Sequence, residues 1–157
     1  MLEKTFRTVS SDETQALGNQ IGAQLCGGEV IEFSSDLGGG KTTFVRGLAQ
    51  GFGSLDVVAS PSFTISYVYT RADGKALYHF DFYRLNDPGI VANELAEVEG
   101  DKDVVVAIEW GEQVHNVLPA ERIHIQIKAL SDNEREICIK APPAYAYLFD
   151  NLQEARA

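Results

Sequence analysis

Apolar residues recur at helical spacing in two stretches of the chain, residues 10–25 and 42–52. The first stretch opens on serines followed by acidic residues, which is typical of a capped helix start, and the glycines at 27–28 stop it. The second stretch ends at Gly51 and Gly53, which suit the backbone after a helix. The residues predicted to be buried are Ala16, Leu17, Ile21 and Leu25 in the first helix, and Phe44, Val45, Leu48 and Phe52 in the second.

Strand patterns surround these helices. Asp73-Gly74 and residues 131–133 predict hairpin turns, because they stand between alternating runs and supply turn chemistry. Residues 103–108 are apolar almost without interruption, as expected of a strand that is covered on both faces. Further helices are predicted from Asn86 to Glu99 and after Pro142. The predicted strands are residues 6–9, at a sheet edge, and 29–33, 65–69, 76–82, 103–108, 122–128 and 135–140.

A glycine-rich turn, DLGGGKTT at residues 36–43, joins the strand at 29–33 to the second helix. Consecutive glycines let several backbone N–H groups converge on one anion, and the following helix start adds unpaired donors and partial positive charge. Such a turn is typical of a phosphate-binding loop. In that arrangement Lys41 reaches the terminal phosphates of a nucleotide, the Thr42 hydroxyl ligates Mg²⁺, and Thr43 caps a neighbouring phosphate.

The full phosphate-loop pattern, G-x-x-x-x-G-K-[ST], fails at its first position. Ser35 stands there, whereas Gly40, Lys41 and Thr42 match the end of the pattern. We predict that Ser35 has a negative φ and ends the preceding strand, because a left-handed serine would cost about 1–2 kcal/mol. The alternative interpretation is a turn that merely links a strand to a helix.

The order of the elements predicts an α/β protein. We expect a P-loop NTPase-like three-layer sandwich with a central mixed, partly parallel sheet. A chain of 157 residues suits a single domain over residues 1–157. Ligands of such sheets bind beyond the carboxyl ends of the strands, so residues at those ends are the candidates for chemistry.

Asp81 and Glu109 end two of the predicted strands. A Mg²⁺ ion on nucleotide phosphates keeps oxygen ligands, usually including one or two carboxylates. One acid would therefore ligate the metal with Thr42, and the other would hold a metal-bound water or orient the attacking water. The alternative is that each acid caps a helix or pairs with an arginine such as Arg84. We expect His79 to be a hydrogen-bonded strand histidine and not a general base.

The chain carries 13 Lys and Arg against 23 Asp and Glu, a formal net charge of −10. This charge disfavours unaided binding to nucleic acid, so any RNA is expected to be held by a partner. Cys26 and Cys138 are too few and too far apart for a disulfide framework or a metal knuckle. Because no apolar run of about 18 residues and no signal-peptide core is found, we expect a soluble, cytoplasmic protein without a membrane role.

Four motifs stand in a fixed order between residues 36 and 110. They are DLGGGKTT at 36–43 followed by Arg46-Gly47, SPSFT at 60–64, HFDFYRL at 79–85 and IEW at 108–110. Together they resemble the bacterial TsaE family, also called YjeE, the small ATPase of tRNA threonylcarbamoyladenosine synthesis. The second motif matches a switch-like segment of that family, although an ordinary turn is the alternative interpretation.

The resemblance implies a site for ATP and Mg²⁺. Thr42 and Glu109 would bind the metal, and Asp81 would serve hydrolysis with Lys41. Arg135 stands about where the family has a basic residue near the nucleotide. The residues implied to hold ATP are Gly38, Gly39, Gly40, Lys41, Thr42, Thr43 and Arg135.

The resemblance also implies partners. Proteins of this family do not transfer the threonylcarbamoyl group themselves, and act on the TsaD–TsaB complex, so tRNA would be met only indirectly through that complex. Two positions depart from the family pattern. Ser35 replaces the usual glycine, and Gly39 stands where alanine is common.

Two other functions are compatible with the same loop. A small-molecule kinase would need an acceptor pocket and usually an arginine-bearing lid, and the chain has no arginine-rich insertion. A nucleotide-sensing module that binds without hydrolysis is the second, and Ser35 keeps it open.

Overall fold

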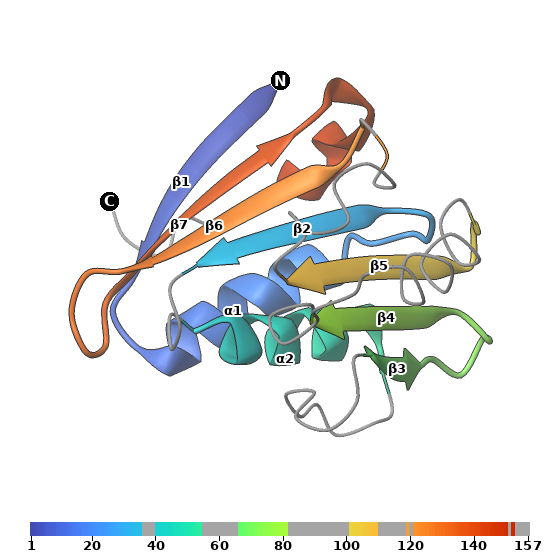
Figure 1. The fold of residues 1–157 in the computed structure, drawn as a ribbon, viewed down its shortest axis with the longest axis horizontal. Helices are drawn as coiled ribbons and strands as arrows, with labels where there is room; N and C mark the ends of the chain where they lie inside the picture. Colours follow the sequence, from blue (N-terminus) through green and yellow to red (C-terminus); the bar gives the residue numbers. More distant parts are fainter. Residues whose placement is uncertain are drawn as a thin grey trace.

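The computed structural model describes residues 1–35, 40–54, 66–81, 101–109, 119, 121–150 and 152. Within these residues, seven strands form one sheet in the order β1-β7-β6-β2-β5-β4-β3 (Figure 1). The strands are β1 (Leu2–Thr8), β2 (Val30–Ser35), β3 (Ser66–Thr70), β4 (Ala76–Asp81), β5 (Val104–Glu109), β6 (Ile123–Ala129) and β7 (Arg135–Ala141). The helices are α1 (Ser11–Gly22), α2 (Lys41–Phe52) and the 3-10 helix η2 (Pro143–Phe149).

The sheet is mixed, as the sequence predicts. β2 runs parallel to both β5 and β6, and β4 runs parallel to β5. The outer pairs β1–β7, β6–β7 and β3–β4 are antiparallel, so β1 is an edge strand and both predicted hairpins are present. Gly74, in the first hairpin turn, has a φ of 91°, the left-handed conformation that its Asp-Gly sequence predicts.

β5 lies in the middle of the parallel part of the sheet, and all six of its residues are buried. The prediction of a strand covered on both faces is therefore confirmed. On one face Val105 and Ala107 join the core cluster that includes residues of α1, α2 and η2. The helix predicted from Asn86 to Glu99, which would contribute to the second outer layer of the sandwich, lies outside the described residues.

α1 starts where its sequence predicts but ends earlier. The Ser10 side chain accepts a hydrogen bond from the Glu13 N–H at 3.1 Å, which caps the first turn. The helix stops at Gly22 and does not continue to about Leu25. Ala16 was predicted to be buried and is exposed; the buried residues of α1 are Thr14, Leu17, Gly18, Ile21 and Gly22.

The reason for this shifted face is a close helix crossing. Each of α1 and α2 presents two glycines to the backbone of the other helix, so the helices approach without intervening side chains. An added Cβ would lie 2.4 Å from the Phe44 carbonyl oxygen at Gly18, 2.1 Å from that of Leu48 at Gly22, 2.0 Å from that of Gln15 at Gly47 and 2.0 Å from that of Asn19 at Gly51. No real Cβ tolerates such distances, so these positions require glycine unless the helices shift.

The buried stripe of α2 agrees with the prediction. Phe44, Val45, Leu48 and Phe52 are all buried against the sheet and α1. Gly53, with a φ of 98°, ends the helix, as predicted. Gly51 does not; it lies inside α2, where it serves the helix crossing.

The segment after Pro142 forms a 3-10 helix, η2, where a C-terminal helix was predicted. Tyr145 interrupts it with a non-helical ψ of 21°. Leu148 is buried in the core, and the Tyr147 hydroxyl donates a hydrogen bond of 2.6 Å to the buried Glu29 carboxylate. Burial and this carboxylate together raise the pKa of the Tyr147 phenol, so η2 is anchored by a protonated hydroxyl.

Among the described residues, no helix has both the length and the apolar character needed to cross a membrane.

The helix crossing leads to a first prediction. Gly22→Ala should lower the free energy of unfolding by about 1–3 kcal/mol, because overpacking against the Leu48 carbonyl outweighs the roughly 1 kcal/mol that alanine gains in helix propensity. Urea unfolding of the full chain measures this. Gln20→Ala on the same helix is the matched control and should leave stability nearly unchanged. A Gly22→Ala protein more stable than the wild type would show that the crossing tolerates a side chain.

Candidate functional site

The carboxyl ends of β2, β4 and β5 meet at one edge of the sheet, where their arrowheads lie side by side in Figure 1. Asp81, the last residue of β4, pairs in register with Glu109, the last residue of β5. On its other side Glu109 pairs with Phe33 of β2, two residues before that strand ends at Ser35. The two predicted acids are therefore neighbours, next to the strand that leads to the glycine-rich turn.

Ser35 is the last residue of β2 and pairs with Ile127 of β6. It ends the strand, as predicted. Residues 36–39 lie outside the described residues, so the predictions for Gly38 and Gly39 remain predictions. The next residue that the structure describes is Gly40.

The N-terminus of α2 is built differently from that of α1. Gly40 caps it with a left-handed backbone (φ 101°, ψ 14°), without a side-chain capping bond and without an acidic residue in the first turn. The Phe44 N–H donates to the Gly40 carbonyl at 3.0 Å, so the N–H groups of residues 41–43 precede the first intrahelical bond. α1, by contrast, carries a serine cap and two first-turn acids of its own. Neither a capping side chain nor a first-turn acid of its own therefore offsets the partial positive charge at the start of α2, and such a helix start suits an anion.

The structure brings Arg135 to this helix start. Arg135 begins β7, and its Nε would lie 3.4 Å from a Cβ added at Gly40. Its Nη1 donates to the carbonyls of Ser131, at 2.7 Å, and Glu134, at 2.9 Å, which hold the guanidinium at the β6–β7 turn. A cation from the β6–β7 hairpin, which is distant in sequence, therefore stands beside Gly40, the cap of α2. The position of Arg135 in the sequence alone could only suggest this placement.

A cavity of about 50 Å³ opens between the starts of α1 and α2 and the β6–β7 turn. Thr43 lines it together with Gly40 and Arg135, all three of which were predicted to contact a nucleotide. The other lining residues are Ser11, Thr14, Asp132 and Asn133. Sequence reasoning missed these four, because their only visible signals were a helix cap and a hairpin turn.

Glu109 has a buried histidine beside it. The His79 Nε2 lies 3.4 Å from the Glu109 Oε2, and the two side chains are 1% and 4% exposed. Neither ring nitrogen of His79 has a hydrogen-bond partner in the part of the chain that the structure describes. The expectation of an ordinary hydrogen-bonded strand histidine is therefore wrong: the ring faces the carboxylate at the end of the neighbouring strand.

Several predicted residues are described by their backbone alone or lie outside the described residues. At Lys41 and Asp81 the structure describes the backbone, which sets one at the first turn of α2 and the other at the end of β4. The segment 60–64 and Trp110 lie outside the described residues.

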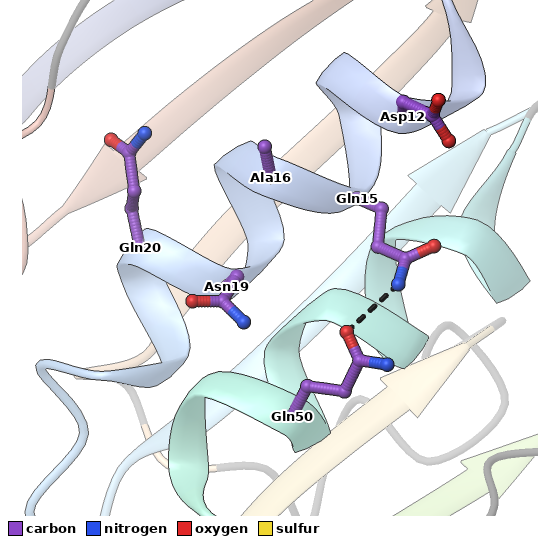
Figure 2. A pocket seen from close by; sticks show the side chains of 6 residues that line it. All are labelled: Asp12, Gln15, Ala16, Asn19, Gln20 and Gln50. Atoms are coloured by element: carbon purple, nitrogen blue, oxygen red, sulfur yellow. Dashed lines mark hydrogen bonds between the residues drawn. The ribbon is translucent and has the colours of Figure 1, made fainter.

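A larger groove of about 420 Å³ lies on the outer face of α1 and α2 (Figure 2). The Gln15 amide donates a hydrogen bond of 2.8 Å to the Gln50 side-chain oxygen across it. Its remaining lining residues are Asp12, Ala16, Asn19 and Gln20. With one carboxylate and no basic side chain, this groove does not suit a phosphate.

These features define a mixed α/β protein whose candidate site comprises a helix N-terminus without a capping side chain, paired strand-end acids and one arginine. A family described as "Threonylcarbamoyl adenosine biosynthesis protein TsaE" has a sequence model that matches residues 8–137. The chain belongs to this TsaE family.

Individual relatives agree with this assignment. The tRNA threonylcarbamoyladenosine biosynthesis protein TsaE of Bacillus subtilis is 39% identical over 144 residues, covering 90% of this chain and 87% of the relative. The protein of the same name from Treponema pallidum is 38% identical, covering 83% and 95%. The crystal structure of Bacillus subtilis YdiB superposes with a TM-score of 0.74 at 36% identity, covering 94% of this chain and 91% of that one.

Proposed function

We propose that this protein is a Mg²⁺-dependent ATPase required for the N6-threonylcarbamoyladenosine modification of tRNA, and that it acts on a TsaD–TsaB-like complex. Its relatives are named as tRNA threonylcarbamoyladenosine biosynthesis proteins, which supports the pathway. One observation supports the ATPase chemistry above the rest. The start of α2, which has no side-chain cap, follows β2; the neighbouring strand β5 ends in Glu109, and the next strand along the sheet, β4, ends in Asp81.

The site's donors suit a nucleotide triphosphate. The N–H groups of residues 41–43 point along the axis of α2 at its positive end, and the Arg135 guanidinium stands beside Gly40. A side chain at Gly40 would be strained by its positive φ, and its Cβ would be in van der Waals contact with that guanidinium. The loop therefore keeps a glycine where a phosphate needs close approach to the backbone.

The donors also suit Mg²⁺. The Thr42 hydroxyl and the Glu109 carboxylate are hard oxygen ligands, and Mg²⁺ prefers such oxygens beside water and phosphate. The bound metal would neutralise charge on the phosphate oxygens. Lys41 would hold the terminal phosphates, and the Asp81 carboxylate would orient a water for attack.

The partners follow from the charge and the relatives. A chain of net charge −10 has little affinity for tRNA by itself, so contact with tRNA would be indirect, through the partner complex. A small-molecule kinase is not favoured, because the matched family and relatives carry the biosynthesis name. The non-hydrolysing module is separated from the ATPase by the turnover measurements below.

Lys41→Ala should weaken ATP binding about 10- to 150-fold, since it removes a charge-assisted contact of about 1.5–3 kcal/mol. Titration with a fluorescent ATP analogue measures this. Lys75→Ala is the matched control. Lys75 immediately precedes the first residue of β4, at the end of the strand opposite to Asp81, and its Nζ donates a hydrogen bond to the Cys26 carbonyl. Unchanged affinity in Lys41→Ala would contradict the proposed pose.

Asp81→Asn should leave folding and ATP binding intact and abolish turnover, because the amide keeps the size of the carboxylate but cannot accept the proton of water. Phosphate release in the presence of the partner proteins measures this. Asp73→Asn is the matched control. Its hydrogen bond with Arg71 lowers the pKa of Asp73 to about 2, so it is an ionised acid at the far end of the same hairpin. Full activity of Asp81→Asn would remove Asp81 from the mechanism, and background turnover of the wild type with partners would favour the sensing module.

Depletion of the protein should lower the content of threonylcarbamoyladenosine in cellular tRNA. Digestion of the tRNA to nucleosides followed by mass spectrometry measures this, and re-expression of the wild type should restore the nucleoside. Asp81→Asn, which keeps the fold and binding, should not restore it. Persistence of the nucleoside after depletion would reject the pathway and leave the ATPase chemistry standing.

A further inference from the structure

His79 is a buried polar residue without an evident structural task. It lies on β4 two residues before Asp81, the last residue of that strand. The ring is 1% exposed, and in the described part of the chain neither ring nitrogen makes a hydrogen bond. Burying a polar group without such a bond is unfavourable by a few kcal/mol, roughly 1–3. Its presence therefore needs another explanation.

The Oε2 of Glu109 lies 3.4 Å from the Nε2 of the ring. The strand register explains how this contact arises. His79 pairs with Ala107, and Glu109 stands two residues further along the same face of β5. Because Ala107 carries only a methyl group, the imidazole extends over it toward the carboxylate. The ring thus lies beneath Glu109, on the side away from the end of the strand.

The neighbour of Glu109 on β2 is apolar, and the His79–Glu109 pair is buried. Phe33 flanks Glu109 in register on β2, and its ring meets that of Phe44 edge-on at 5.7 Å between centroids. In such low-dielectric surroundings a hydrogen bond to a carboxylate is stronger than in water. It also holds the carboxylate in one orientation.

We propose that His79 is a positioning residue that orients the Glu109 carboxylate for Mg²⁺. The inference rests on the proposed function, in which Glu109 is a metal ligand. With a proton on Nε2, the ring donates to Oε2, which leaves Oε1 to face the metal. Carboxylates that ligate metals are commonly held by such a second hydrogen bond. The 3.4 Å separation exceeds the usual 2.7–3.2 Å for N–H···O, and contacts of this kind shorten when the ligand binds.

The test is a Mg²⁺ titration of the full-length protein with ADP carrying an N-methylanthraniloyl fluorophore. His79→Leu removes the donor and fills the site with an apolar side chain. Its Mg²⁺ midpoint should rise about 10-fold or more, as for other losses of a ligand's hydrogen-bond partner. Its affinity for the labelled ADP in EDTA should not change. His79→Gln, whose amide nitrogen reaches the place of Nε2, should restore the wild-type midpoint.

Two control variants bracket the result. Glu109→Ala, which removes the proposed ligand itself, should weaken the Mg²⁺ dependence. His124→Leu should leave it unchanged, because His124 lies on the opposite face of β6, 3.4 Å from the Ser34 hydroxyl. A His79→Leu midpoint equal to that of the wild type would overturn the role of His79.

Thermal melting shows which variants fold. If His79→Leu does not fold, the Mg²⁺ midpoints of His79→Gln and His79→Asn are compared instead. The Asn amide nitrogen at position 79 reaches only the place of Nδ1. The proposal requires Gln to keep the wild-type midpoint and Asn to raise it, and equal midpoints for the two would overturn it. If the wild type binds no labelled ADP, or binds it equally with and without Mg²⁺, the proposed function itself is overturned, together with this role of His79.

Discussion

The contact on which the rest of the structure depends is the crossing of α1 over α2. Two glycines from each helix bring backbone against backbone, with carbonyl oxygens where side chains would otherwise stand. Because α1 is held this close, the start of α1 lies beside the start of α2. Ser11 and Thr14 then line the same cavity as Gly40 and Thr43. The crossing glycines themselves carry no predicted chemistry, yet the crossing sets the walls of the candidate site.

The N-terminal N–H groups of these two helices are capped in different ways. α1 compensates its own N-terminus with the Ser10 hydroxyl and two first-turn acids. α2 has a left-handed glycine cap and no first-turn acid of its own, and a glycine in place of a serine cap costs only about a few tenths of a kcal/mol. A helix start without a capping side chain is slightly less stable alone, and its N–H groups suit an anion. Of these two adjacent helices, α1 has an N-terminus that favours the stability of the helix, and α2 has one that favours the binding of an anion.

Buried charged and polar groups also differ between the candidate site and the rest of the fold. Away from the site, Glu29 accepts hydrogen bonds from the N–H groups of Cys26 and Gly27 and from the Tyr147 hydroxyl. Such a carboxylate is satisfied inside the fold and anchors η2. At the strand ends, the His79 ring faces the Glu109 carboxylate at a longer distance and makes no hydrogen bond within the described part of the chain. Within the described residues, the fold therefore completes the hydrogen bonds of Glu29 and leaves the buried His79 ring without one.

Much of this molecule follows from local pattern. The buried stripe of α2, the doubly covered β5, the Ser10 cap and the Asp-Gly turn each depend on neighbours within a few residues, so the sequence alone determined them. The chemistry of Gly40 and its helix start was equally visible. The strand-end positions of Asp81 and Glu109 marked both acids as candidates, and the family resemblance suggested which role each of them has.

The tertiary structure decided what depends on segments distant in the chain. It exposed Ala16, because the crossing glycines took over the buried face of α1. It placed Arg135 beside Gly40, paired Asp81 with Glu109, and set His79 under that carboxylate. Periodicity reports which side of one element is apolar. It does not report register, crossing distance or the partner strand, because these arise only when separate elements pack together.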